Sequence, residues 1–174
     1  GLYAAEVVAT VTPVERNQVA IFINVDEGPV AKIKGINFIG NKVFSESTLL
    51  GQMQLKTGGW LSWYVKDDLY SKQKLTADLE TIRSYYLNRG YLEFVIDSTQ
   101  VSITPDKKGI YLTIGINEGK RFTVKDIRLA GELLGKEAEL KRLLALKRGD
   151  IFSSAKLGET TKAIAEVLGS YGYA

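Results

Sequence analysis

The sequence contains neither cysteine nor histidine, and these two absences remove most of the common catalytic and metal-binding chemistry. Without cysteine the chain has no disulfide, no thiolate nucleophile and no thiolate metal site, although this does not fix its compartment. Without histidine it lacks the commonest general base and the commonest metal ligand. An enzyme would need paired carboxylates, and no pair has a suggestive spacing. We therefore expect no catalytic residue, no metal and no cofactor.

Long apolar runs and a strong charge of one sign are also missing. No stretch of 18 apolar residues occurs, so no transmembrane helix is predicted. The 23 basic and 20 acidic residues are interspersed and leave a net charge of +3, which does not favour binding to nucleic acid or to an anionic membrane. The chain begins at Gly1 without a signal-peptide pattern, so we expect it to be a segment of a longer protein.

What the sequence does contain is an internal repeat. Leu55–Gly58 reads Leu-Lys-Thr-Gly and returns 91 residues later as Leu-Lys-Arg-Gly in Leu146–Gly149. The pair Glu27-Gly28 returns after the same interval as Glu118-Gly119, whereas Gly90-Tyr91 returns after only 82 residues. The difference predicts an insertion of nine residues after Gly58. A period of this size indicates a tandem array of small units.

Hydrophobic spacing predicts the elements of the central copy, 29–119. A strand is expected over 33–39, followed by a helix that begins after an N-cap at Ser45 and ends before Gly58. A longer helix is expected over 70–88, ended by a left-handed Gly90. Two further strands, 92–104 and 110–117, complete a β-α-α-β-β unit. One face of the longer helix carries Leu75, Leu79, Ile82 and Tyr86.

Two finer predictions concern the surface of this unit. Lys74–Asp78 and Glu80–Arg83 have the spacing of exposed helical ion pairs. The segment 105–109, Pro-Asp-Lys-Lys-Gly, is expected to be a turn in which proline fixes φ and Gly109 supplies a positive φ.

The two ends of the chain hold complementary parts of the same unit. Residues 1–28 read as the C-terminal hairpin of a preceding unit, with its turn at Pro13. Residues 120–174 read as the N-terminal β-α-α part of a following unit, with a strand over 122–129 and helices near 136–146 and 154–169. Complementary halves of this kind suggest head-to-tail self-association between molecules of this segment.

Short motifs then suggest a family. Ile39-Gly40-Asn41 with Phe44, and Tyr85-Tyr86-Leu87 with Arg89-Gly90-Tyr91, resemble POTRA repeats. The segment 97–111 is similar to the third POTRA repeat of the BamA-type outer-membrane protein assembly factors. The resemblance implies an α+β fold of tandem β-α-α-β-β repeats. Each repeat would have a three-stranded mixed sheet of order 1-3-2, with two antiparallel helices on one face.

The same resemblance implies a function. It predicts a periplasmic scaffold of an outer-membrane protein, with a C-terminal β-barrel outside this chain as the membrane anchor. The scaffold would bind accessory lipoproteins, BamB at this repeat, and guide unfolded outer-membrane proteins by β-strand addition. The alternatives are a POTRA array of another outer-membrane secretion or translocation transporter and, in another class, a small α/β nucleic-acid-binding module.

The strand 92–104 is the candidate peptide-binding edge, because order 1-3-2 leaves it with one neighbour. Its apolar residues change parity between Ile96 and Val101, which a β-bulge within 97–100 would resolve. Such a bulge either protects the edge from aggregation or belongs to an edge that accepts an extended peptide. The candidate residues are Val95, Ile96, Asp97, Ser98, Thr99, Gln100, Val101, Ser102 and Ile103.

Two further groups are candidates for partner docking. Ala20, Phe22 and Asn24 face away from the presumed core of the first hairpin. The aromatic residues of the insertion either pack onto their own unit or contact a partner, since tryptophan and tyrosine often anchor interfaces. These residues are Trp60, Trp63 and Tyr64.

Overall fold

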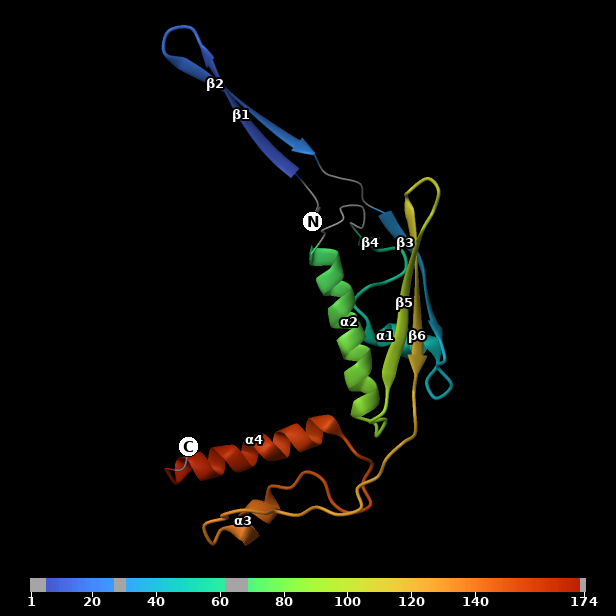
Figure 1. Ribbon diagram of the computed structural model, residues 1–174, viewed down its shortest axis with the longest axis vertical. Helices are drawn as coiled ribbons and strands as arrows, with labels where there is room; N and C mark the ends of the chain where they lie inside the picture. The colour runs from blue at the N-terminus through green and yellow to red at the C-terminus, as the bar shows by residue number, and fades with distance from the viewer. Residues whose placement is uncertain (1–5, 27–30, 62–68, 173–174) are drawn as a thin grey trace.

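The computed structural model describes residues 6–26, 31–61 and 69–172. The molecule is elongated and has three successive parts (Figure 1). A β-hairpin lies at one end, an α+β unit lies in the middle, and a segment containing two helices lies at the other end.

The hairpin consists of β1 (Glu6–Val14) and β2 (Gln18–Asp26), paired antiparallel. The predicted turn at Pro13 is wrong, because Pro13 lies within β1 opposite Val19. The turn comes later, where Arg16 and Asn17 adopt positive φ values of 62° and 58°. Both strands of a two-stranded ribbon are edge strands, so a residue without an N–H is tolerated there.

The central sheet has the strand order β4-β3-β6-β5. Its strands are β3 (Ala31–Ile39), β4 (Trp60–Leu61), β5 (Val95–Ile103) and β6 (Gly109–Asn117). β6 pairs in parallel with β3 and antiparallel with β5, which confirms the predicted order 1-3-2. The sequence did not predict β4, in which two residues of the insertion pair antiparallel with the start of β3.

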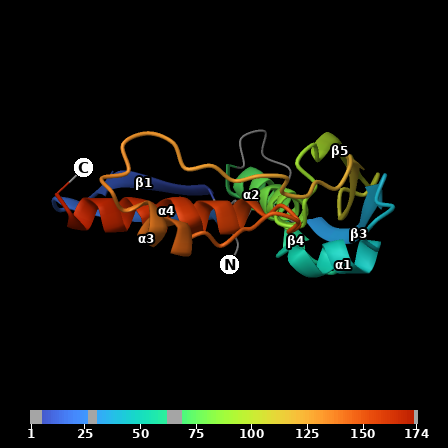
Figure 2. The same ribbon diagram turned by 90° about the horizontal axis from the view of Figure 1, so that it is seen from below.

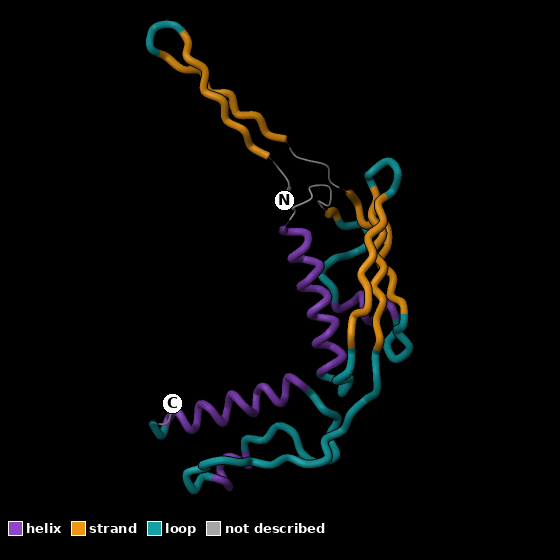
Figure 3. Tube along the Cα trace, viewed as in Figure 1, coloured by secondary structure: helices purple, strands orange, loops and turns teal. Residues whose placement is uncertain are grey.

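Two helices, α1 (Glu46–Gln52) and α2 (Leu69–Leu87), cover one face of this sheet (Figure 3). Ser45 caps α1 as predicted, and its hydroxyl accepts a hydrogen bond from the Thr48 N–H at 3.2 Å. α1 ends earlier than expected, because Met53 is already extended. The core between sheet and helices includes Ile33, Ile36, Phe38, Leu49, Ile82, Tyr86, Ile110, Leu112 and Ile114.

Asp78 of α2 is buried, so the predicted surface pair with Lys74 is wrong. The Asp78 side chain is 2% exposed, and its carboxylate oxygens accept hydrogen bonds from the Gln54 and Leu55 N–H groups, each at 2.8 Å. These two residues come just after the end of α1, so their N–H groups lie outside the hydrogen-bond pattern of the helix, and the Asp78 carboxylate satisfies them instead. The other predicted pair is confirmed, with 3.4 Å between Arg83 Nε and Glu80 Oε1.

The turn between β5 and β6 also differs from the prediction. Lys107, not Gly109, has the positive φ, 60°. The Thr104 hydroxyl donates to Asp106 and accepts a hydrogen bond from the Gly109 N–H at 2.9 Å. A Cβ at Gly109 would lie 2.9 Å from Thr104 Cγ2, so glycine is needed for close approach and not for its φ.

The C-terminal segment contains α3 (Glu137–Arg142) and α4 (Ser154–Ser170), which Figure 2 shows from below. Ser153 caps α4 and accepts from the Lys156 N–H at 3.3 Å. The predicted strand over 122–129 is wrong, since its place holds a single antiparallel bridge between Thr123 and Ile151. β3 has β6 as a parallel partner within its own unit, whereas the described residues after 119 contain no strand to play that part.

Two hydrogen bonds join this segment to the end of α2. Phe122 N–H donates to Gly90 O and Ala155 N–H donates to Asn88 Oδ1, both at 2.8 Å. Gly90 has a φ of 93°, as its predicted role as helix cap requires. A Cβ at Gly90 would lie 2.9 Å from both Phe122 O and Ile151 Cγ2. Glycine therefore permits the close approach of the segment as well as the end of the helix.

Candidate protein-interaction surfaces

The outer edge of β5 presents main-chain groups that no described strand pairs with. The Thr104 N–H donates to Gly109 O at 2.9 Å, so these two residues form a hydrogen-bonded antiparallel pair. Such pairs alternate along a ladder with pairs that do not exchange hydrogen bonds. The register then leaves Thr99, Val101 and Ile103 with N–H and C=O groups that point away from β6.

The predicted bulge is confirmed at Asp97. Ile96 lies opposite Ile116 and Ser98 lies opposite Gly115, so Asp97 is the extra residue of β5. A Cβ on Gly115 would lie only 2.5 Å from Ser98 Oγ, so the absence of a side chain there accommodates the strand after the bulge. The regular edge that could pair with a further strand therefore runs from Ser98 to Ile103.

Side chains along this edge are polar on one face and apolar on the other. Ser98, Gln100 and Ser102 are exposed on one face of the strand. Ile96 and Val101 are half-buried against the core, whereas Ile103 is 40% exposed. An added strand would meet mainly main-chain groups and small polar side chains, which discriminate little among peptide sequences.

The β1–β2 hairpin exposes both of its faces. The predicted docking face carries Ala20, Phe22 and Asn24, which lie opposite Thr12, Thr10 and Val8. Phe22 is 64% exposed and Ala20 is half-buried. The other face, which was expected to be the core side, is apolar and just as exposed. Its members include Val7, Ala9, Val11, Pro13, Val19, Ile21 and Ile23.

The aromatic residues of the insertion give less information. Trp60 lies in β4, where its backbone pairs with Lys32. Trp63 and Tyr64 lie outside the described residues. The docking role expected for these three residues stays a prediction.

Glu118 is a buried hydrogen-bond acceptor whose structural role the sequence did not predict. It is 6% exposed, and its carboxylate accepts hydrogen bonds from Lys42 N–H at 2.7 Å, Val43 N–H at 3.0 Å and the Tyr86 hydroxyl at 2.8 Å. Burial, followed by the hydrogen bond to Glu118, raises the pKa of Tyr86 far above its ordinary value. The repeated Glu-Gly pair was the available signal, and it marks a structural tie between β6, the β3–α1 loop and α2.

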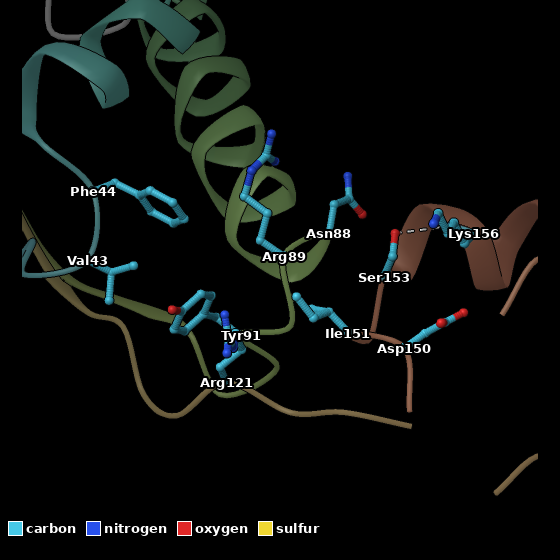
Figure 4. A pocket seen from close by; sticks show the side chains of 10 residues that line it. All are labelled: Val43, Phe44, Asn88, Arg89, Tyr91, Arg121, Asp150, Ile151, Ser153 and Lys156. Carbon is cyan, nitrogen blue, oxygen red and sulfur yellow. Dashed lines mark hydrogen bonds between the residues drawn. The ribbon is translucent and has the colours of Figure 1, made fainter. Parts of the chain in front are cut away.

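A pocket of about 520 Å³ lies where the central unit meets the C-terminal segment (Figure 4). Two of its polar side chains have partners at the contact between the two parts: Asn88 accepts from Ala155 N–H, and the Arg89 guanidinium lies 3.6 Å from the centre of the Tyr85 ring. The pocket therefore forms part of the joint between the two parts. Its lining consists of Val43, Phe44, Asn88, Arg89, Tyr91, Arg121, Asp150, Ile151, Ser153 and Lys156.

Within the described part of the chain no three acidic residues gather as metal ligands would. No described helix is both long enough and apolar enough to cross a bilayer.

Comparison with known families identifies this architecture. The model of the POTRA family, described as a surface antigen variable number repeat, matches residues 31–119 and again 122–174. The chain belongs to the POTRA family. POTRA repeats of the BamA type are non-enzymatic, which agrees with the catalytic groups that the sequence lacks.

Individual relatives agree on the type of POTRA repeat. The outer membrane protein assembly factor BamA of Neisseria meningitidis serogroup B is 34% identical over 170 residues, which cover 97% of this chain and 21% of that protein. BamA of Buchnera aphidicola is 29% identical over 161 residues, or 91% of this chain and 26% of that protein. The chain thus corresponds to the POTRA region and spans a quarter or less of most such relatives.

A solved structure gives the same result. The crystal structure of Haemophilus influenzae BamA POTRA3-5 superposes with a TM-score of 0.72 at 35% identity, over 80% of this chain and 55% of that one. The POTRA repeats of this chain are therefore of the BamA type in fold as well as in sequence.

Proposed function

We propose that this chain acts in the periplasm as a scaffold of the outer-membrane β-barrel assembly machinery. Its β5 edge, Val95 to Ile103, receives extended segments of unfolded outer-membrane proteins by strand addition. The observation that carries this proposal is the outer edge of β5, with which no described strand pairs and where the main-chain groups of Thr99, Val101 and Ile103 are directed outward. The assembly-factor relatives support this role over that of a secretion or translocation transporter.

The energetics support transient guidance of a client. A client strand along Ser98 to Ile103 would gain about four to six main-chain hydrogen bonds, each contributing about 0.5–1.5 kcal/mol net. Ordering an unfolded client and losing its free motion offset much of this gain. Dissociation constants of roughly millimolar to tens of micromolar follow, which let a client leave for the next step.

The second part of the proposal is that accessory lipoproteins dock on this region, with BamB as the expected partner. The exposed ring of Phe22, flanked by Ala20 and Asn24, offers an aromatic anchor on one face of the hairpin. Trp60, Trp63 and Tyr64 of the insertion are the second candidates for this contact.

A peptide titration tests the strand-addition role. The C-terminal strand of an outer-membrane protein, as a synthetic peptide, is added to the labelled chain while backbone amide shifts are recorded. We expect shifts concentrated over Val95–Ile103. Val101→Pro should abolish them, because proline removes an N–H that the added strand would use.

Val101→Ala is the matched control, because it shortens the same side chain and keeps the N–H. It should bind the peptide nearly as well as the parent chain. Absence of shifts in the parent, or equal loss in both variants, would contradict strand addition and leave the bulged edge as a protected one. Shifts confined to the hairpin or the insertion would leave partner docking as the main role.

A further inference from the structure

The pocket between the central unit and the C-terminal segment has an apolar wall that other aromatic residues hold in place. Phe44 forms part of this wall. The centre of its ring lies 5.0, 5.1 and 6.0 Å from the ring centres of Tyr85, Tyr86 and Tyr91, and each pair has an edge-to-face arrangement. Contacts of this kind fix the orientation of the Phe44 ring, so this part of the wall is formed before anything binds.

Hydrogen bonds hold the loop that carries this wall. Asn41 Nδ2 donates to Phe44 O at 3.1 Å, and Val43 N–H donates to the Glu118 carboxylate at 3.0 Å. Figure 4 shows Val43 and Phe44 on one side of the pocket and Ile151 on the other. Val43 and Ile151 remain 47% and 45% exposed. An apolar side chain could therefore lie between them with little ordering of the pocket.

Basic side chains outnumber acidic ones around the same pocket. Its charged lining residues are Arg89, Arg121, Lys156 and Asp150. Arg121 and Lys156 are exposed, and neither forms an ion pair with an acidic residue in the described part of the chain. The Asp150 carboxylate accepts a hydrogen bond from Lys147 N–H at 2.9 Å. The pocket thus combines an apolar wall with a net positive charge.

Both arginines lie at the end of α2. Arg89 Nη1 donates to Tyr85 O at 3.0 Å, which uses only part of the N–H donors of its guanidinium. The Arg121 side chain passes close to Gly90, where a Cβ would lie 3.0 Å from Arg121 Cγ. The two side chains therefore approach the pocket from neighbouring points on the backbone, and both can donate to a carboxylate there.

The start of α4 does not form the anion site by itself. Ala155 N–H donates to Asn88 Oδ1 at 2.8 Å, and Lys156 N–H donates to Ser153 Oγ at 3.3 Å. Because these main-chain donors already have acceptors, the basic side chains would have to hold a carboxylate in the pocket.

The pocket lies on the side of the C-terminal segment that corresponds to β4. In the central sheet, β4 and β6 flank β3 on opposite sides. Thr123 bridges Ile151 just as Lys32 pairs with Trp60, 91 residues earlier in the sequence. Ile151 thus has the place of β4, and the pocket lies apart from the side on which β6 lies in the central unit.

We propose that this pocket docks an acidic peptide segment of a partner protein, in which an aromatic or aliphatic side chain is flanked by carboxylates. The apolar side chain would lie against Phe44 and Ile151, and the carboxylates would contact the three basic side chains. Charge complementarity favours this occupant, because an uncharged segment would leave the cations unpaired. No residue of Val95–Ile103 lines the pocket, so the proposal does not depend on strand addition at β5.

An amide-shift titration with a capped peptide, Glu-Asp-Phe-Asp-Glu, tests the proposal. We expect the largest shifts at Val43, Phe44, Ile151 and Lys156. Two control peptides separate the charge from the apolar side chain: Gln-Asn-Phe-Asn-Gln lacks the carboxylates, and Glu-Asp-Ala-Asp-Glu lacks the ring. Each should bind about tenfold more weakly than the first peptide. Equal binding of all three peptides, or shifts that avoid the pocket, would overturn the proposal.

Two lysines of α4 provide matched variants. Lys156 and Lys162 are both exposed, but only Lys156 lines the pocket. Lys156→Gln should weaken binding of the acidic peptide about two- to fivefold, and the double variant with Arg121→Gln should weaken it about tenfold. Lys162→Gln should bind like the parent chain. Equal loss in the two lysine variants, or unchanged affinity in the double variant, would contradict the assignment of these cations.

Salt and lipid distinguish a peptide ligand from other anionic surfaces. Raising the salt concentration from about 0.05 M to about 0.5 M should weaken binding of Glu-Asp-Phe-Asp-Glu, because screening acts on exposed charges. Binding of Gln-Asn-Phe-Asn-Gln should not change. Vesicles of phosphatidylglycerol should leave the amides of Val43 and Ile151 unshifted. Shifts at these amides with vesicles but not with the acidic peptide would overturn the proposal in favour of a lipid surface.

Discussion

At the scale of the residue, a few buried side chains tie this fold together by satisfying main-chain donors. Glu118 accepts from Lys42, Val43 and Tyr86. Replacement by alanine would leave these donors unpaired, and we expect Glu118→Ala to lower the free energy of unfolding by about 3 kcal/mol or more. Urea denaturation followed by circular dichroism measures this change.

Glu80 provides the control for that measurement. It lies on the surface with its side chain 63% exposed, in an ion pair with Arg83. Glu80→Ala should change stability by no more than about 0.5 kcal/mol. If the two variants lost the same free energy of unfolding, the buried hydrogen bonds of Glu118 would not stabilise the fold as proposed.

Tyr86 links stability to alkaline pH. The pKa of Tyr86 is raised in the folded protein, which means that the folded state favours the neutral hydroxyl. The resulting contribution to the free energy of unfolding is fully present below the ordinary pKa of 10.0 and is lost as pH rises above it. Between pH 9 and pH 11 the parent should lose about 1.4 kcal/mol more stability than Tyr86→Phe, which has no hydroxyl to ionise. Parallel urea titrations at the two pH values test this, and identical losses would exclude the linkage.

The sequence did not predict the roles of buried polar residues whose hydrogen-bond partners are distant along the chain. The spacing of Lys74 and Asp78 fits a surface pair, but nothing in local sequence reveals that Asp78 faces the end of α1. The buried role of Glu118 could not be predicted for the same reason, because the groups that donate to it lie more than 30 residues away in the sequence. Tyr86 and the other apolar residues of α2 were predictable, because helical periodicity alone places them on one face.

At the scale of the element, the sequence predicted both the strand β5 and the bulge within it. The change of parity between Ile96 and Val101 required an extra residue, and the structure has it at Asp97. β4 and the turn at Arg16 could not be anticipated, because a two-residue strand has no periodicity and proline can occupy a free strand edge. The segment 122–129 has a strand pattern, but a pattern forms a strand only beside a partner.

The direction of main-chain groups along β5 leads to a contrast between two proline variants. Val101 points its N–H outward, whereas the N–H of Ser102 faces β6 in the alternating ladder. Ser102→Pro should therefore destabilise the chain by roughly 1–3 kcal/mol more than Val101→Pro. Thermal or urea unfolding measures both, and the opposite order would reverse the assignment of the outward groups.

At the scale of the whole molecule, Gly90 sets how closely the C-terminal segment approaches the central unit. Gly90 and Gly149 have similar positive φ values, 93° and 90°, but only a Cβ at Gly90 would meet Phe122 O and Ile151 Cγ2. Both alanine variants carry the backbone strain, and Gly90→Ala should cost about 1–3 kcal/mol in addition.

Urea unfolding of the two glycine variants gives the comparison, and amide shifts show where the effect lies. Gly90→Ala should perturb Phe122 and Ala155, whose N–H groups bond across the joint. If the two variants lost the same free energy of unfolding and the Phe122 and Ala155 amide shifts did not change, the contact between the two parts would not depend on the close approach at Gly90.

The most direct test of the central claim is residue-resolved hydrogen exchange along β5, with and without the peptide from an outer-membrane protein. In the free chain, Gln100 and Ser102 should be protected by β6, and Thr99, Val101 and Ile103 should exchange fast. Added peptide should slow the exchange of those three amides selectively. Uniform change along the strand, or no change at the three amides, would contradict a strand-receiving edge.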